Sequence, residues 1–160
     1  MAYTPIIGTI GYLVADGRVL LVHRTRDGDV HAGKWNGLGG KLEAGEDIWS
    51  SLCRELHEEA GITVTSARLR GTVSWPGFGK DGEDWFGFIF VVDGWDGTPP
   101  AVNDDGPLVW HDLSGLDDLP MWEGDRQWLP LVFGDGPVFH GVMPYVDGRP
   151  ASWSYVEADD

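Results

Sequence analysis

The sequence predicts an α/β or α+β domain in which strands of mixed order alternate with two helices. Segments rich in Val, Ile, Thr and aromatic residues indicate strands, and a run with apolar residues every four positions indicates a helix. The 24 Gly and 10 Pro residues supply turns between these segments. The 160 residues suffice for one core without disulfides, so we expect a single domain over residues 1–160.

The first predicted elements form a β-hairpin. Residues 4–14 are rich in Ile, Thr, Tyr and Val, and the apolar segment 18–24 follows a turn at 15–17. Residues 27–45 are typical of a loop, because glycines interrupt the segment at positions 28, 33, 37, 39, 40 and 45. We therefore expect a loop between the hairpin and the first helix.

The first helix is predicted over residues 47–60. Ile48, Leu52 and Leu56 recur every four residues and define one apolar face. Asp47 is a suitable N-cap, and Gly61 stands where a left-handed residue ends a helix. Both ends of this helix are thus predicted by local chemistry.

The second half of the chain predicts further strands and one more helix. The helix lies between residues 124 and 133, and Pro130 starts or interrupts it. Strand composition recurs in five segments: 67–75, 85–92, 108–111, 138–142 and 152–156.

The charge balance bears on possible partners. Twenty-six acidic residues against eleven basic ones give a formal charge of −15. Such a surface repels polymeric nucleic acid, whose binding requires Lys and Arg at the phosphates. A small polyphosphate remains a possible ligand if divalent cations bridge it to the protein. The simpler interpretation of most of these acids is that they keep the protein soluble.

Cysteine content and hydropathy bear on the compartment. The single Cys53 excludes an intramolecular disulfide, and its apolar neighbours indicate packing rather than a nucleophilic role. No apolar stretch reaches the length of a membrane span, and the N-terminus lacks the basic start of a signal peptide. We expect a cytoplasmic protein that does not contact membranes.

The polar face of the first helix carries a cluster of charges. Glu55 and Glu59 are four residues apart and Glu55 and Glu58 three apart, so helical geometry brings three carboxylates toward one point, beside Arg54. Clustered carboxylates repel one another, and divalent cations with oxygen ligands relieve that repulsion. The alternative from the helix alone is a solvated acidic face.

The spacing around this helix is more specific. The segment GKLEAGEDIWSSLCRELHEEAGI, residues 40–62, resembles the Nudix signature, with every fixed position filled. By composition alone such a match arises about once in ten million. The segments WNGLGGKLEAGE, MWEGDRQWLP and VFHGVMPY also resemble the oxidised-purine branch of that family, which includes MutT-type and human MTH-type enzymes. The resemblance extends roughly over residues 6–145.

This resemblance implies a Nudix fold, an α/β/α sandwich around a mixed β-sheet, whose loop–helix–loop holds Mg²⁺, with Mn²⁺ as an alternative. By matching positions, Glu55 and Glu59 are the expected direct ligands. Glu58 is a further ligand or the base that activates water, and the Gly39 carbonyl oxygen completes the set. Arg54, together with Glu46, is expected to orient these carboxylates.

Residues outside the signature extend the expected site. Asp105 lies where the family often places another acidic ligand or base, with Asp104 as its nearest rival. Basic residues able to contact phosphate are few. Arg24 is the first candidate, with Arg26 and Lys41 behind it, and the alternative for Arg24 is an ordinary surface cation.

The resemblance also implies a base pocket. Asn36 matches a base-contacting Asn, and Trp122 matches a Trp that stacks on or lines the base. The human-type enzymes place two adjacent Asp residues shortly afterwards, but here Gly124 replaces the first and only Asp125 matches. Four further tryptophans are equally compatible with core packing or ligand contact: Trp35, Trp75, Trp85 and Trp128.

Three functional hypotheses follow. The first is an enzyme that hydrolyses oxidised purine nucleoside triphosphates such as 8-oxo-dGTP to the monophosphate and pyrophosphate. The second is a Nudix hydrolase of another substrate, an ordinary dNTP or a nucleotide sugar. The third is a non-catalytic nucleotide sensor, which the intact glutamates disfavour. The expected partner is a nucleotide with its divalent metal, and the expected assembly is a monomer or homodimer.

Overall fold

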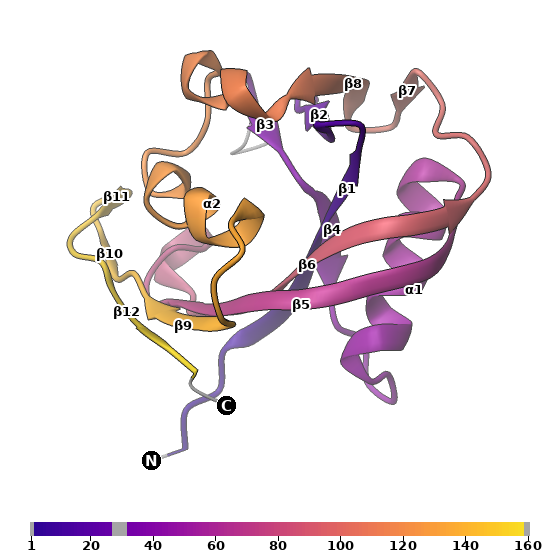
Figure 1. Ribbon diagram of the computed structural model, residues 1–160. Helices are drawn as coiled ribbons and strands as arrows, with labels where there is room; N and C mark the ends of the chain where they lie inside the picture. Colours follow the sequence, from indigo (N-terminus) through magenta and orange to yellow (C-terminus); the bar gives the residue numbers. More distant parts are fainter. Residues whose placement is uncertain (1, 27–31, 159–160) are drawn as a thin grey trace.

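The computed structural model describes residues 2–26 and 32–158 and contains a large sheet flanked by helices (Figure 1). The elements of the first half are β1 (Ile6–Ala15), β2 (Arg18–His23), β3 (Trp35–Asn36), β4 (Leu38–Lys41), α1 (Ile48–Ala60), β5 (Thr63–Trp75) and the 3₁₀ helix η1 (Lys80–Gly82). Those of the second half are β6 (Trp85–Asp96), β7 (Val102–Asn103), β8 (Gly106–Asp112), the 3₁₀ helix η2 (Leu113–Asp118), α2 (Asp125–Phe133), β9 (Phe139–Val142), β10 (Tyr145–Val146), β11 (Arg149–Pro150) and β12 (Ser154–Glu157).

The large sheet contains both parallel and antiparallel pairs. Its strands follow the order β12-β9-β5-β6-β1-β2-β8-β7, with β3 paired to β2 and β4 paired to β1. β1 runs parallel to β6 and β5 runs parallel to β9, whereas the other pairs are antiparallel. The predicted mixed sheet is therefore confirmed, with β1 connecting its two halves.

Two apolar clusters occupy opposite faces of the sheet. Along β6, Ile89 and Val91 pack in one cluster with residues of α2, whereas Phe90 and Val92 pack in the other with residues of α1. Because successive side chains of a strand point to opposite faces, this alternation places α1 and α2 on the two sides of the sheet (Figure 1). The predicted α/β/α arrangement is observed.

Helix α1 begins and ends where the sequence predicts. The Asp47 side chain accepts a hydrogen bond of 2.7 Å from the Ser50 amide at the N-terminus. Gly61 adopts a left-handed conformation, with φ of 65°, and its N–H donates to the His57 carbonyl at 3.0 Å. Leu52 and Leu56 are fully buried against the sheet. The position of α1 therefore fixes the direction of its polar face.

Helix α2 starts before Pro130 and continues beyond it, so the prediction that Pro130 starts or interrupts the helix is wrong. The buried Arg70 of β5 compensates at the C-terminal end: its Nε donates to the Val132 carbonyl and its Nη2 to the Leu131 carbonyl, both at 3.0 Å. These are carbonyl groups that a helix end leaves without intrahelical donors. The sheet thus stabilises the helix that Pro130 would weaken.

The segment predicted as a loop contains two strands. Residues 27–31 lie outside the described part of the chain, but β3 and β4 occupy 35–41. Gly39, with φ of 152°, pairs with Ile10 so closely that an added Cβ would overlap the Thr9 carbonyl oxygen. Glycine is therefore required inside this strand, which is why its composition resembles that of a loop.

Strand lengths also differ from prediction. β5 begins four residues before the expected segment 67–75, and β6 extends to Asp96, four residues past 85–92. The short strands β7, β10 and β11 and the 3₁₀ helices were not expected. Pairing between β5 and β6 continues through irregular register shifts after Val64, Ser66 and Leu69, so long-range pairing rather than local composition sets these lengths.

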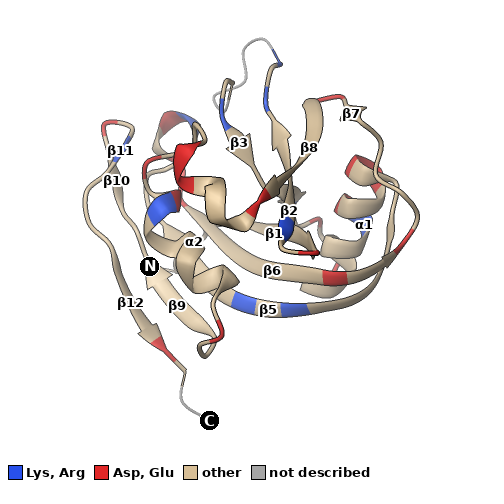
Figure 2. Ribbon diagram, turned by 45° about the horizontal axis from the view of Figure 1, so that its top comes forward, with Lys and Arg blue, Asp and Glu red and all other residues tan. Residues whose placement is uncertain are grey.

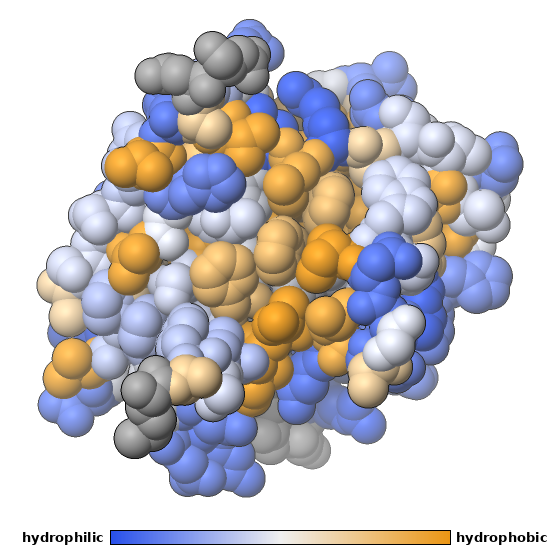
Figure 3. All heavy atoms as spheres, turned by 90° about the horizontal axis from the view of Figure 1, so that it is seen from below, coloured by the Kyte–Doolittle hydropathy of each residue, from blue (hydrophilic) through white to orange (hydrophobic). Residues whose placement is uncertain are grey.

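Acidic residues outnumber basic ones along the chain, 26 to 11. Lys and Arg lie on β5 and around the ends of β2 and β3, whereas acidic residues occur on α1 and in most connecting loops (Figure 2). One face carries a band of hydrophobic side chains bordered by hydrophilic ones (Figure 3). Among the described residues, no helix has the length and apolarity needed to cross a membrane.

Candidate active site

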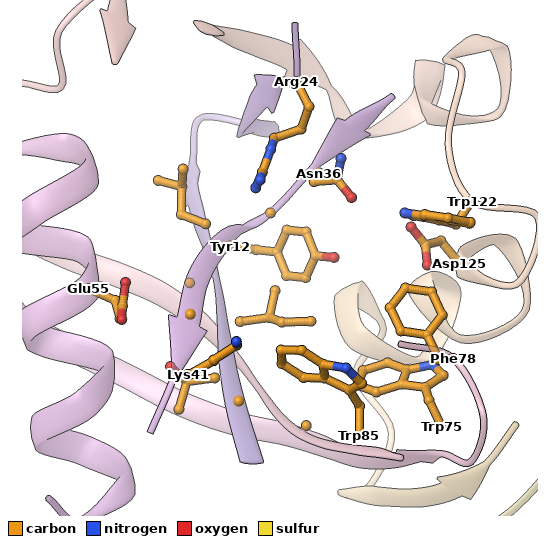
Figure 4. Close-up of a pocket in the computed structure, with 18 of the residues that line it drawn as sticks. Tyr12, Arg24, Asn36, Lys41, Glu55, Trp75, Phe78, Trp85, Trp122 and Asp125 are labelled. Carbon is orange, nitrogen blue, oxygen red and sulfur yellow. The ribbon is translucent and has the colours of Figure 1, made fainter. Parts of the chain in front are cut away.

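One cavity, with a volume of about 420 Å³, lies between β4, the neighbouring strands and α2 (Figure 4). Its polar end is lined by Arg24, Gly39, Lys41, Glu55, Glu59 and Asp105. Its aromatic end is lined by Trp75, Phe78, Trp122, Asp125, Trp128 and Tyr145. Asn36 lies between the two ends, and Trp85 lines the wall beside Lys41, whose Nζ is 5.6 Å from the centre of its ring. The fold therefore brings most of the expected site residues into one pocket.

Helix α1 presents two of its glutamates to this pocket. Glu55 and Glu59 line it, one helical turn apart, and face the glycines of β4. A Cβ at Gly40 would lie only 2.5 Å from the Glu55 carboxyl group. Glycine at this position therefore lets the strand approach the carboxylate.

Arg54 lies behind the glutamates and does not line the pocket. Its Nε donates to Glu46 at 2.7 Å, and its Nη1 donates to Glu55 at 2.9 Å and to Glu58 at 3.3 Å. Its Nη2 also donates to the Lys41 carbonyl at 3.2 Å. Arg54 therefore joins the helix to the preceding loop and holds the Glu55 carboxylate in place, a contact that orients a site residue rather than a substrate.

Glu59 is the most desolvated of the helix carboxylates. One oxygen accepts a hydrogen bond of 2.9 Å from the Gly39 amide. Burial, with smaller effects from the charges of Glu55 and Asp105, raises the pKa of Glu59 to about 8 despite that hydrogen bond. Negative charge at this position thus lacks sufficient compensation from the protein alone.

Asp105 completes the polar end. One of its oxygens lies 3.8 Å from Nη2 of Arg24 and 3.7 Å from Nη1 of Arg26. Arg24 lines the pocket, and its exposed side-chain fraction is 24% against 66% for Arg26. Arg24 is therefore better placed than Arg26 to meet an anion in the cavity.

The predicted convergence of three carboxylates is wrong for these side-chain positions. Among residues 2–26 and 32–158, no three His, Cys, Asp or Glu side chains gather into a ready-made cation site. The Glu58 side chain is 57% exposed and bonds to Arg54 instead of lining the pocket, while Glu59 turns to the Gly39 amide. Arg54 Nη1 thus holds both Glu55 and Glu58, whereas Glu59 is held separately by the Gly39 amide.

The donor chemistry nevertheless fits a hard divalent cation. Two helix carboxylates, the Asp105 carboxylate and the backbone of Gly39 line one cavity, and all offer oxygen atoms. The raised pKa of Glu59 shows that added positive charge would stabilise its ionised form. Glu55, Glu59 and Asp105 are the acidic residues of the cavity near its polar end that could supply oxygen ligands.

The opposite end is an aromatic chamber. The Phe78 ring lies edge-on to Trp122 and to Tyr145, with centroid distances of 5.1 and 4.9 Å. The ring centroids of Trp75 and Trp128 are 6.0 Å apart, and both side chains are buried. These two residues therefore belong to the core and also line the pocket. A chamber lined by aromatic rings is suited to a planar ring.

Asp125 is the acidic group in this chamber. Desolvation raises its pKa to about 7, against which the charges of Arg126 and Lys34 act weakly. Lys34 itself lies over Trp122, with Nζ 4.4 Å from the ring centre. The amide nitrogen of Asn36 donates to the Lys34 carbonyl at 3.3 Å, so Asn36 is held in a fixed orientation at the pocket wall.

Some residues fell outside the sequence predictions. Tyr12, Phe78 and Tyr145 line the cavity although no role was assigned to them. Tyr145 ends the segment VFHGVMPY, whose resemblance to the family was the available signal. In contrast, Trp35 does not line the cavity, and its ring stacks on His23 with a centroid distance of 4.5 Å. Its role is packing.

The mixed sheet lies between two helices, and one cavity joins helix carboxylates to an aromatic chamber. The family model described as the NUDIX domain matches residues 3–132. The chain belongs to the Nudix family and is a Nudix hydrolase, an enzyme acting on pyrophosphate bonds. Enzymes of this family generally use divalent metal ions.

Individual relatives support this membership. The chain is 36% identical over 130 residues to the oxidized purine nucleoside triphosphate hydrolase of Danio rerio, covering 81% of each chain. It is 46% identical over 138 residues to the CTP pyrophosphohydrolase of Escherichia coli, covering 85% of this chain and 90% of that one. Among solved structures, a mutator MutT protein from Bacillus halodurans aligns with a TM-score of 0.80 and 30% identity, covering 94% of this chain and 97% of the other.

Proposed function

We propose that this Nudix hydrolase cleaves purine nucleoside triphosphates, including the oxidised nucleotide 8-oxo-dGTP, into the nucleoside monophosphate and pyrophosphate, with Mg²⁺ as its cation. The observation that carries this proposal is the continuity of the cavity, whose aromatic end suits a base and whose polar end suits phosphates. The similarity to the Danio rerio enzyme, named for oxidised purine nucleoside triphosphates, supports the same substrate class.

At the polar end, hydrolysis requires positive charge to neutralise the phosphates and a base that removes a proton from the attacking water. Glu55, Glu59 and the Gly39 carbonyl oxygen would hold the divalent cation, with Asp105 as a further ligand or base. When bound, the cation supplies positive charge to the phosphate oxygens and increases the acidity of water at the site. Glu58 retains its proposed role as the alternative base, although its side chain bonds to Arg54 outside the cavity.

The remaining polar residues of this chain position the substrate. Arg24 donates to phosphate oxygens from the cavity wall, and Lys41 reaches them from the end of β4. Arg54 keeps Glu55 in its orientation through the hydrogen bond of 2.9 Å. Holding the reacting groups in place is the main contribution that proteins make to phosphoryl chemistry.

At the aromatic end, Trp122 lines the base and Asn36 contacts it. Base stacking on an aromatic side chain contributes about 1–3 kcal/mol and accepts many bases. Selection among bases therefore depends on polar groups such as Asn36 and Asp125 rather than on Trp122.

A second candidate is hydrolysis of CTP, which the 46% identity to the Escherichia coli CTP pyrophosphohydrolase favours. An ordinary dNTP or a nucleotide sugar as substrate, and a sensor without catalytic activity, are the remaining alternatives. All of them predict binding of a nucleotide, so a panel of substrates separates them.

The test is a screen for Mg²⁺-dependent release of pyrophosphate or monophosphate from 8-oxo-dGTP, 2-hydroxy-dATP, the normal dNTPs, CTP and several NDP-sugars. We expect 8-oxo-dGTP to be preferred over dGTP by more than about tenfold, or about 1.4 kcal/mol. A flat profile contradicts the preference for oxidised purines, and turnover of CTP or an NDP-sugar alone contradicts the purine proposal. Complete inactivity combined with tight nucleotide binding supports the sensor.

A further inference from the structure

The space beside Gly124 is occupied by side chains from a distant segment. Gly124 is the N-cap of α2, and a Cβ added there would lie 2.3 Å from the Met143 sulfur and 2.9 Å from the Tyr145 hydroxyl oxygen. Met143 is fully buried and Tyr145 is 7% exposed. A side chain at position 124 would therefore displace Met143 or Tyr145, and the Tyr145 hydroxyl is the polar group that occupies this space.

The Tyr145 ring is held firmly in this position. Its backbone N–H donates to the Pro76 carbonyl at 2.7 Å, and the residue pairs with Pro150 in the small sheet formed by β10 and β11. The ring lies edge-on to Phe78, with an interplanar angle of 72°. The hydroxyl group therefore has a fixed direction within the aromatic chamber.

Two polar groups of the chamber have unused hydrogen-bonding capacity. Within the described part of the chain, neither the Asp125 carboxyl group nor the Tyr145 hydroxyl makes a side-chain hydrogen bond to protein, although both line the cavity. Polar groups in largely desolvated surroundings normally have partners. A ligand with complementary groups would provide them.

The protonation of these groups decides what they recognise. Burial, followed by the charge of Asp125, raises the pKa of Tyr145 well above its usual range, so the phenol keeps its proton near neutral pH and donates a hydrogen bond. The pKa of Asp125 is raised to about 7, so its carboxyl group is mostly ionised only above neutral pH, where it accepts hydrogen bonds. At such a pH the two groups offer one donor and one acceptor to the same cavity.

We propose that Tyr145 is a specificity-determining residue which, together with Asp125, selects purines that carry a carbonyl oxygen at position 6 next to a ring N–H. This proposal rests on the proposed hydrolysis of purine nucleoside triphosphates. The Tyr145 hydroxyl donates to the 6-carbonyl oxygen, and the Asp125 carboxylate accepts from the neighbouring ring N–H. A 6-aminopurine has an amino group at position 6 and an unprotonated ring nitrogen beside it. Its amino donor would face the Tyr145 donor, and its ring nitrogen, an acceptor, would face the Asp125 acceptor.

The substrates dITP and dATP test recognition of position 6 and the adjacent ring nitrogen directly, because they differ only in the group at position 6 and in the proton on that nitrogen. We expect the wild type to have a kcat/KM for dITP at least about tenfold above that for dATP, the effect of one matched against one mismatched hydrogen bond. Tyr145→Phe should lower this ratio by about tenfold, mainly through dITP. A wild-type preference for dATP overturns the proposal.

Two further variants make the comparison specific. Tyr155→Phe removes a hydroxyl from an exposed ring on β12 and should leave the ratio unchanged. Tyr12→Phe removes the other phenol that lines the cavity, whose pKa is raised by burial and also by the charge of Asp125, and so identifies which of the two phenols sets the ratio. A ratio that falls with Tyr12→Phe and not with Tyr145→Phe contradicts the assignment to Tyr145.

Binding measurements separate this proposal from the proposed function. Calorimetric titration of dIMP and dAMP into wild type and Tyr145→Phe, with thermal melts as a folding check, requires no turnover. Wild type that hydrolyses none of the purine triphosphates refutes the proposed function. Active wild type whose dITP-to-dATP ratio and dIMP affinity survive Tyr145→Phe unchanged refutes only the role of Tyr145.

Discussion

The Gly39 amide donates a hydrogen bond of 2.9 Å to the Glu59 carboxylate and so joins β4 to the last turn of α1. The same carboxylate is desolvated and lies near the charges of Glu55 and Asp105. One backbone donor does not offset these effects, since the pKa of Glu59 is raised to about 8. The position of Glu59 is therefore fixed by β4, and its ionised form would be stabilised by a cation in the cavity.

Replacing Glu59 by Gln tests that connection. The Gln side chain keeps an oxygen that accepts from the Gly39 amide, so the fold should remain intact, but the negative charge is lost. We expect Mg²⁺-dependent hydrolysis to fall by at least about a hundredfold, the upper range for losing a group that only orients a cation ligand, because Glu59 is proposed as a ligand itself. Pyrophosphate release and thermal unfolding measure the two effects, and Glu157→Gln on β12 serves as the control. Near-normal activity of Glu59→Gln contradicts the assignment.

The first helix and its glutamates could be predicted from the sequence because the interactions that define them join residues close together in the chain. Asp47 and Gly61 set the helix ends through bonds to residues three or four positions away. The spacing of Glu55 and Glu59 places both on one face. Local periodicity and capping chemistry therefore predicted both this element and its contribution to the cavity.

The remaining parts depend on contacts between distant segments. Gly39 belongs to a strand because β4 pairs with β1, a relationship that its glycine-rich sequence does not indicate. Glu58 lies outside the cavity, bonded to Arg54, a contact that its spacing from Glu55 and Glu59 does not reveal. Tyr145 enters the aromatic chamber from beyond β9, beside Gly124. Side-chain partners and pocket walls of this kind follow from tertiary packing rather than from spacing in the sequence.

Trp122→Ala tests the aromatic chamber. Loss of a stacking surface should raise KM for purine triphosphates by about tenfold, within the range of base–aromatic stacking, and change hydrolysis of a base-free polyphosphate much less. Trp49→Ala is the matched control, since Trp49 is 44% exposed on α1 and contacts Phe90 rather than the cavity. Steady-state kinetics on both substrate types provide the measurement. Equal effects on both would assign Trp122 to the core instead.

Asp125→Asn tests the protonation of the chamber. Desolvation raises the pKa of Asp125 to about 7 in the folded protein, whereas an unfolded Asp titrates near a pKa of about 3.9. The folded state therefore favours the protonated form: its contribution to stability is fully present below about pH 3.9 and is lost as pH rises through about 7. Asn cannot ionise, so the variant should lose less stability than wild type between pH 5 and pH 8.

Denaturant unfolding at several pH values measures this difference in stability. Asp118→Asn, which changes an exposed carboxylate on η2, should follow the wild-type pH profile. Parallel profiles for wild type and Asp125→Asn would show that Asp125 ionises freely in the folded protein, and would remove the desolvation argument.

Arg70→Ala tests the attachment of α2 to the sheet. Arg70 is 4% exposed, and its guanidinium donates to the carbonyls of Val132 and Leu131, both at 3.0 Å. Its removal leaves two carbonyls at a helix end without these donors, so the free energy of unfolding should fall by about 2–3 kcal/mol. Arg68→Ala, an exposed arginine on the same strand, should change it by less than about 0.5 kcal/mol.

The same variant has an expected effect on the site, because α2 carries Asp125 and Trp128 into the aromatic chamber. At temperatures where Arg70→Ala is still folded, a loosened α2 should raise KM for purine triphosphates by several fold, while kcat, which depends on the polar end, changes little. Urea unfolding and steady-state kinetics on one preparation give both quantities. If Arg70→Ala and Arg68→Ala behave alike in both assays, the Arg70 contacts do not hold α2, and the position of Asp125 must depend on the packing of Trp128 and Val132 alone.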